Sequence, residues 1–133
     1  MMQCSLMGGL AFQKGLGAVH SLSHPLGASP LHLHHGTLNA LFLAPVLRFN
    51  QAACSSRVDE VATAMGLPSG LDVPLAFERL VLDLGLPSRL RDLGVRQESL
   101  LELSQLAAID HCSATNPRPF DEQAAYQLYA ERW

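Results

Sequence analysis

The chain reads GAVHSLSHPLGA at residues 17–28, and this stretch indicates the class of fold. Here and along most of the chain, apolar residues recur at helical spacing, and no alternating run is long enough to indicate a strand. The stretch predicts a helix over residues 18–26 that ends at Gly27. We therefore expect an all-α protein.

Six further helices are expected on either side of this stretch, at residues 2–13, 36–50, 57–65, 72–84, 97–111 and 121–132. Asp72 and Asp121 are placed to cap two of them, and Pro45 is expected to kink a third. Residues 85–95 form a connector with room for one helical turn, and residues 112–120 form a loop. The sequence therefore predicts one helical domain over residues 1–133, a bundle of about seven helices.

The composition is that of a globular protein, because 48% of the 133 residues are apolar and only 16% are charged. Twelve acidic residues outnumber nine Lys and Arg, which gives a net charge of −3. Nucleic-acid-binding proteins need a basic surface, so this balance argues against that class.

Cysteine spacing and hydropathy indicate the compartment. Three cysteines without a CxxC pair favour a reducing cytoplasm. Lys14, His20 and His24 lie inside the early stretch that a signal peptide would need to be apolar. The longest apolar run, residues 38–47, is far shorter than the roughly 20 residues that span a bilayer. We therefore expect a soluble cytoplasmic protein.

Charge is divided unevenly along the chain. No Asp or Glu precedes Asp59, whereas five of the six histidines lie within residues 1–57. The half of the chain that is rich in imidazoles therefore contributes no carboxylate to help hold a cation.

The histidines themselves suggest a metal site. His20 and His24 are four residues apart, so both project from one face of the expected helix. His34 and His35 come just before the next helix, and the two helices could direct His20 or His24 and His34 or His35 toward one point. Neutral imidazole is a good ligand for Zn²⁺ and Fe²⁺. The alternative is that these are solvated or hydrogen-bonded structural histidines.

Several ordered motifs resemble the iron-containing (group III) alcohol dehydrogenases. The first is HxxxHPLG within residues 17–28, and the second is HHGTLNA at residues 34–40. VLRFN at residues 46–50, DHCSATNPRP at residues 110–119 and YQLY at residues 126–129 continue the match to the end of the chain. The resemblance covers the later part of that family's C-terminal helical domain.

The resemblance implies a role for each candidate residue. His20 and His35 match two of the four metal ligands of the family, and His34 is the fallback for His35 because the preceding loop is one residue longer than the family pattern. His24 matches a second histidine near the nicotinamide that acts in proton relay or cofactor contact. Cys112 resembles a position beside the cofactor, although a buried apolar role suits it equally. Residues 116–119 are expected to form a rigid turn that sets the last helix.

The resemblance also implies an activity and its requirements. A divalent metal, Fe²⁺ or Zn²⁺, would act as Lewis acid on an alcohol or carbonyl oxygen while hydride passes to or from NAD or NADP. The family's nucleotide domain and its Asp and further His ligands have no counterpart here, so we expect a C-terminal fragment that needs a missing domain. The alternatives are an inactive truncated remnant and a helical interaction module. We expect a homo-oligomer, or a partner chain that covers the apolar N-terminal half.

Overall fold

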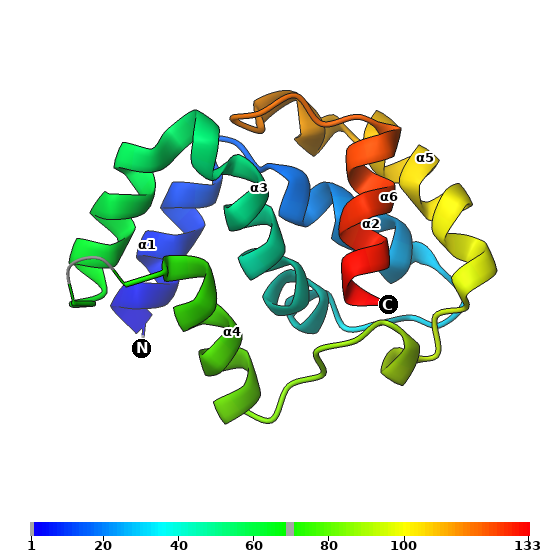
Figure 1. Ribbon diagram of the computed structural model, residues 1–133, viewed down its shortest axis with the longest axis horizontal. Helices are drawn as coiled ribbons and strands as arrows, with labels where there is room; N and C mark the ends of the chain where they lie inside the picture. Colours follow the sequence, from blue (N-terminus) through cyan, green and yellow to red (C-terminus); the bar gives the residue numbers. More distant parts are fainter. Residues whose placement is uncertain (1, 69–70) are drawn as a thin grey trace.

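The computed structural model describes residues 2–68 and 71–133, and the regular structure there is entirely helical, which confirms the all-α fold (Figure 1). Within that part of the chain the α-helices are α1 (Met2–Phe12), α2 (Ala18–Ala28), α3 (His35–Ala64), α4 (Val73–Asp83), α5 (Leu100–Ile109) and α6 (Glu122–Arg132). Short 3₁₀ helices connect them: η1 (Arg91–Leu93), η2 (Gln97–Ser99) and η3 (His111–Thr115).

Helix α2 lies at the centre of the fold, in contact with α3, α5 and α6. Ala18, Leu22 and Leu26 follow one another at four-residue steps, so they form one stripe along α2, and each is at most 1% exposed. Burying a leucine side chain stabilises the fold by roughly 1.5–3 kcal/mol. The core continues on the facing helices with Leu38, Leu41, Phe42, Val46, Leu100, Leu103, Ala107, Ala125, Leu128 and Tyr129.

Tyr129 ties α6 to α2 through this core. Its side chain is fully buried, and its ring meets the Phe42 ring edge to face with 5.5 Å between centroids. Its hydroxyl donates to the Leu22 carbonyl oxygen at 2.6 Å. Burial raises the pKa of this hydroxyl far above its usual value, so it stays protonated and remains a donor.

The expected helices at residues 36–50 and 57–65 join in α3, which is why the structure has six α-helices in its described part rather than about seven. They meet at Cys54, whose φ of −147° and ψ of 39° are not helical. The Cys54 thiol donates to the Asn50 carbonyl oxygen at 3.3 Å. Pro45 was expected to kink the helix, but its backbone stays helical and the break lies at Cys54 instead.

The predicted caps are confirmed. The carboxylate of Asp72 accepts the Leu75 N–H at 3.1 Å and begins α4, and the carboxylate of Asp121 accepts the Ala124 N–H at 2.8 Å and begins α6. The connector at residues 85–95 holds the short helix η1, which ends at Gly94 with a positive φ of 82° that glycine adopts readily.

The expected helix at residues 97–111 divides into η2 and α5, and it ends earlier than predicted. Asp110 has an extended backbone, with φ −64° and ψ 136°, so α5 stops at Ile109. The carboxylate of Asp110 accepts the Cys112 N–H at 2.9 Å and begins η3, inside the stretch expected to be a loop. This break redirects the Asp110 side chain toward α2.

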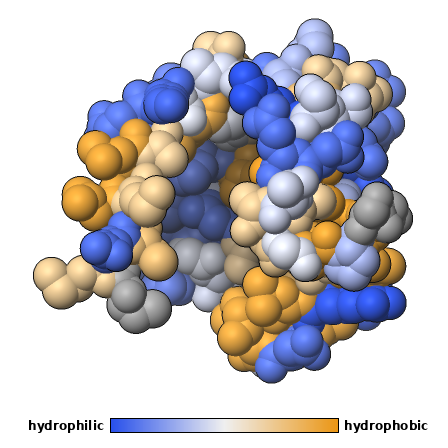
Figure 2. Space-filling view, turned by 90° about the vertical axis from the view of Figure 1, so that its left-hand side faces the viewer, coloured by the Kyte–Doolittle hydropathy of each residue, from blue (hydrophilic) through white to orange (hydrophobic). Residues whose placement is uncertain are grey.

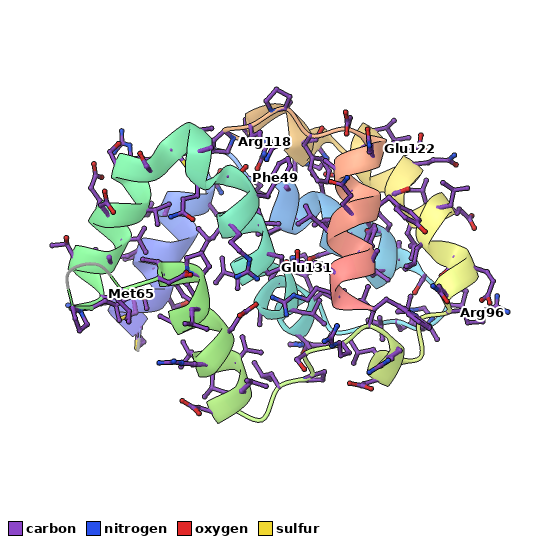
Figure 3. The ribbon with its side chains drawn as sticks, viewed as in Figure 1. Phe49, Met65, Arg96, Arg118, Glu122 and Glu131 are labelled. Carbon is purple, nitrogen blue, oxygen red and sulfur yellow. The ribbon has the colours of Figure 1, made fainter. Side chains whose placement is uncertain are left out.

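Ion pairs join α3, α4 and α6. Glu78 of α4 accepts from Arg48 of α3 at 2.8 Å and also from Arg132 of α6, while Arg48 reaches Glu131 of α6 at 3.1 Å. Figure 3 shows Glu131 on the side of α6 that faces α3. The hydrogen bond from Arg48 lowers the pKa of Glu78, and burial opposes this only in part.

One side of the molecule is hollowed and carries apolar patches among polar surface. Figure 2 looks at the side that carries α1, the second half of α3 and α4, where apolar patches border a deep hollow. Helix α1 buries none of its residues, and its large apolar side chains are exposed: Met2, Leu6, Met7, Leu10 and Phe12. Among the described residues, no helix combines the length and the apolar character needed to cross a membrane.

Candidate metal centre

Three imidazoles converge where α2 faces the start of α3. The ring centroids of His20 and His35 are 5.2 Å apart, those of His24 and His35 are 5.5 Å apart, and those of His20 and His24 are 5.8 Å apart. His111, on η3, adds a fourth ring 6.0 Å from that of His24. Four imidazoles from three separate elements therefore form one group, which we call the imidazole cluster.

The local fold of α2 and α3 explains this convergence. His20 and His24 are one turn apart on α2, on the side away from the buried Leu22. Both are half-buried, whereas His35 at the first turn of α3 is exposed. The imidazole cluster thus lies at the surface of the helical bundle, open to a ligand or to another protein surface.

His34 has a different role from His35. Its Nδ1 accepts the Thr37 N–H at 3.3 Å and lies 3.1 Å from the Thr37 hydroxyl, so its ring caps the start of α3. The structure therefore brings His35 beside His20, while His34 is held at the helix end.

The protonation of His20 suits metal binding. Burial lowers its pKa, and the neighbouring His35 and His24 lower it further, against a smaller opposite effect of Asp110. The neutral imidazole that results carries a lone pair, which is the form that binds a metal. Among the described residues, the rings of His20 and His35 have no hydrogen-bond partner.

Asp110 brings a carboxylate to the imidazole cluster. Its Oδ2 lies 2.9 Å from Nδ1 of His24, and its Oδ1 accepts the Cys112 N–H at 2.9 Å. The Ser21 hydroxyl donates to the same Oδ1 at 3.4 Å. Burial alone would raise the pKa of Asp110, but the hydrogen bonds from His24 and Cys112 outweigh it and lower the pKa. Asp110 is therefore an ionised acceptor at neutral pH.

Cys112 lies beside this carboxylate. It is 2% exposed, and its Sγ is 3.5 Å from Nε2 of His111. Burial and the adjacent Asp110 raise the pKa of its thiol to about 11, so the thiol stays protonated and is a poor nucleophile. In the described part of the chain, one mixed set of donors has all its ligand atoms within 4.8 Å of one another, namely His24, Asp110 and Cys112.

Asn116 fixes the start of the helix that carries His20. Its Oδ1 accepts the Ala18 N–H at 3.1 Å and an Asn50 amide hydrogen at 2.9 Å. Its Nδ2 donates to Asn50 Oδ1 at 2.8 Å and to the Arg118 carbonyl oxygen at 2.7 Å. Arg118 in turn stacks over the Phe49 ring at 4.1 Å (Figure 3). The turn at residues 116–119 thus joins η3 to α2 and α3.

Comparison with known proteins places the chain in a family. A model of the Fe-containing alcohol dehydrogenase family, C-terminal part, matches residues 1–133. The chain belongs to this family. The iron-containing dehydrogenase resemblance inferred from the motifs is thereby confirmed.

Curated relatives are named as dehydrogenases and reductases. 4-Hydroxybutyrate dehydrogenase of Cupriavidus necator is 45% identical over 126 residues, a match that covers 89% of this chain and 33% of that protein. Lactaldehyde reductase of Escherichia coli K12 is 35% identical over 134 residues, covering 94% of this chain and 35% of that protein. This chain spans about a third of the length of these relatives.

Solved structures of the family share the fold. A 1,3-propanediol oxidoreductase superposes with a TM-score of 0.83 at 32% identity, over 89% of this chain and 33% of that one. Alcohol dehydrogenase from Oenococcus oeni superposes with a TM-score of 0.85 at 28% identity, over 94% of this chain and 35% of that one. The helical arrangement is therefore that of the C-terminal part of iron-containing alcohol dehydrogenases.

The donor set of this family member fits a divalent transition metal. His20 and His35 offer neighbouring imidazoles without other hydrogen-bond partners among the described residues, and neutral nitrogen donors suit Fe²⁺ and Zn²⁺. His24 faces Asp110 through Nδ1, which leaves its Nε2 without a partner among the described residues. The assignment of His20 and His35 as ligands, and of His24 and Cys112 as cofactor contacts, stays a prediction.

The carboxylate of this site was not predicted from the sequence. The acid-free stretch before Asp59 indicated that the histidines lack a carboxylate nearby, but the fold brings Asp110 from the acidic half of the chain to His24. His111 was missed in the same way. Both residues stand in the motif DHCSATNPRP, so the signal was their position directly before Cys112 in a motif shared with the family.

Proposed function

We propose that this chain forms the metal-binding helical part of a metal-dependent alcohol dehydrogenase that interconverts small alcohols and aldehydes with NAD or NADP. Membership of the iron-containing family supports the reaction class. The convergence of His20, His24 and His35 is the single observation that carries the proposal, because it provides a donor group at the positions of the family motifs.

In this proposal His20 and His35 hold the metal, Fe²⁺ or alternatively Zn²⁺. Bound there, a divalent metal supplies Lewis-acid polarisation of the substrate oxygen. Two imidazoles fall short of the three or more protein ligands that a catalytic metal site requires. The remaining ligands and the nicotinamide-binding domain are proposed to come from protein outside these 133 residues, consistent with relatives of which the chain spans about a third.

The chain's other site residues handle the proton and the cofactor. His24 exchanges a proton with the substrate hydroxyl or with water through the ring nitrogen that does not face Asp110. Cys112 stays a protonated thiol and contributes an apolar contact near the nicotinamide rather than a nucleophile. A reducing cytoplasm, the compartment we propose, keeps Cys4, Cys54 and Cys112 as free thiols.

Metal titration of the 133-residue chain tests this proposal. Isothermal titration with anaerobic Fe²⁺, and separately with Zn²⁺, should show one site per chain. His20→Ala and His35→Ala should each weaken binding about tenfold or more, a loss of about 1.4 kcal/mol or more for each. His32→Asn is the matched control, because His32 is exposed, lies outside the imidazole cluster and has a positive φ of 47° that asparagine tolerates.

The outcome separates the proposal from an inactive remnant. Binding that depends on His20 and His35 but not on His32 supports a metal centre. Binding that is equally strong in all four proteins, or absent from the unaltered chain, contradicts it. Oxidation of alcohols with NAD⁺ or NADP⁺ is then measured with a full-length protein that contains this chain.

A second candidate function is a helical interaction module, and the exposed apolar surface of α1 favours it. Met2, Leu6 and Leu10 are each more than half exposed, and α1 buries none of its residues. We propose that a partner chain or a second copy covers this surface. A monodisperse monomer that binds no apolar dye would count against this function.

A further inference from the structure

We propose that Asp110 is the positioning residue for His24: it holds the imidazole in the tautomer that carries its proton on Nδ1, with Nε2 left as the free basic nitrogen. This inference rests on the proposed function only for the use that the reaction makes of Nε2. The hydrogen-bond arrangement itself is a property of the chain.

The two carboxylate oxygens of Asp110 have different hydrogen-bond partners. Oδ1 accepts the Cys112 N–H at 2.9 Å and the Ser21 hydroxyl at 3.4 Å, whereas Oδ2 faces His24 Nδ1 at 2.9 Å. The side chain of Asp110 is 14% exposed, and its backbone lies at the junction of α5 and η3. The carboxylate is thus fixed from three directions, so Oδ2 has a defined position relative to the ring.

An ionised carboxylate has no hydrogen to donate, and this decides the tautomer. A hydrogen bond between Oδ2 and Nδ1 requires the proton to be on Nδ1. In the neutral ring, Nε2 then carries the lone pair and can accept a proton. Without Asp110, the ring would be free to place its proton on Nε2, and this nitrogen would lose its function as a base.

The contact also explains why an acid-free half of the chain can support this chemistry. His24 and Asp110 are 86 positions apart, and they meet because α2 packs against α5. The carboxylate comes from residues 59–133, which hold all twelve acidic residues. The uneven division of charge therefore leaves His24 with one carboxylate partner at hydrogen-bond distance.

Asp110→Asn tests the tautomer with little change of shape. The Cys112 N–H needs an acceptor, so it keeps the amide oxygen at the Oδ1 position and places the amide NH₂ opposite His24. Nδ1 must then accept, which moves the ring proton to Nε2; the same substitution in the Ser-His-Asp triad keeps the geometry and gives the wrong tautomer. Asp121→Asn is the matched control, because Asp121 also caps a helix through a carboxylate, at the start of α6.

The measurement is long-range ¹H–¹⁵N NMR of the metal-free 133-residue chain at pH 8, which distinguishes protonated from unprotonated ring nitrogens. We expect Nδ1–H for His24 in the unaltered chain and in Asp121→Asn, and Nε2–H in Asp110→Asn. Observation of Nε2–H in the unaltered chain overturns the proposal, and this needs no variant to fold. Unchanged Nδ1–H in a folded Asp110→Asn protein also overturns it.

Zn²⁺ titration of the same variant separates positioning from ligation, because His24, Asp110 and Cys112 could also bind a metal together. We expect Asp110→Asn to change the Zn²⁺ affinity less than about threefold, a difference of under about 0.7 kcal/mol. A loss of Zn²⁺ binding identifies Asp110 as a ligand and contradicts a positioning role. If the proposed function is wrong, metal binding will be unchanged in His20→Ala. That outcome does not affect the tautomer result.

Discussion

Asn116 holds together three segments of the chain, so its replacement by alanine should destabilise the protein strongly. The amide makes four hydrogen bonds, to Ala18, to Arg118 and twice to Asn50. Arg118 is exposed, so its carbonyl can turn to water when the partner is lost. Ala18 and Asn50 are 0% and 7% exposed, and they cannot do so.

The expected loss follows from these two buried groups. A buried polar group left without a partner costs about 1–3 kcal/mol. We therefore expect Asn116→Ala to lower the free energy of unfolding by about 3 kcal/mol and the melting temperature by roughly 10 °C. Because α2 begins at Ala18, the loss should loosen the helix that carries His20.

Urea unfolding followed by circular dichroism measures this loss, with the slope m checked for constancy. Asn39→Ala is the control, since Oδ1 of Asn39 is buried without a hydrogen-bond partner among the described residues, and the variant should lose less than about 1 kcal/mol. In the double variant Asn50→Ala with Asn116→Ala, the total loss should be smaller than the sum of the single losses by about 1 kcal/mol or more. A loss below about 1 kcal/mol for Asn116→Ala, or strictly additive losses in the double variant, would contradict the structural role of Asn116.

Three further predictions concern the core, the ion pairs and the buried thiol. Tyr129→Phe should lose about 1 kcal/mol of stability in urea unfolding, because it removes one buried hydrogen bond and keeps the ring; a loss above about 3 kcal/mol would point to disrupted packing. The hydrogen bond from Arg48 lowers the pKa of Glu78 in the folded state. The ionised carboxylate therefore stabilises the fold fully above the unfolded-state pKa, and this stabilisation is lost as the pH falls through the folded-state pKa. Between pH 7 and pH 3, the free energy of unfolding should therefore fall less in the Glu78→Gln variant than in the unaltered chain. Equal falls would contradict a stabilising role of the ion pair. At pH 8 a maleimide should modify exposed Cys4 much faster than buried Cys112, because the Cys112 thiol has a pKa of about 11. Mass spectrometry measures both rates, and equal rates would show that Cys112 is accessible.

The helices were predictable because their signals are local. Apolar spacing located α2, and Asp72 and Asp121 marked two helix starts through short-range caps. The break in α3 was harder, because proline is the usual sign of a kink, whereas here the helical backbone continues through Pro45 and breaks at Cys54. A backbone change at a residue without special stereochemistry has no clear local signal.

The candidate site was predictable in part. The i, i+4 spacing of His20 and His24 is local and places both rings on one face of α2, and the motifs pointed to His35. The contact of Asp110 with His24 depends on how α2 packs against α5 and on the end of α5 at Ile109. Contacts between residues so distant in sequence arise from tertiary packing, which spacing alone does not encode.

X-ray absorption spectroscopy of the Zn²⁺-loaded 133-residue chain identifies the side chains that hold the metal, because imidazole ligands give a characteristic multiple-scattering pattern. We predict at least two imidazole ligands with Zn–N distances of about 2.0–2.1 Å, and the loss of one imidazole in His20→Ala. A metal surrounded only by oxygen or sulfur donors, or an unchanged imidazole number in His20→Ala, would contradict the assignment of His20 and His35 as the metal-holding pair.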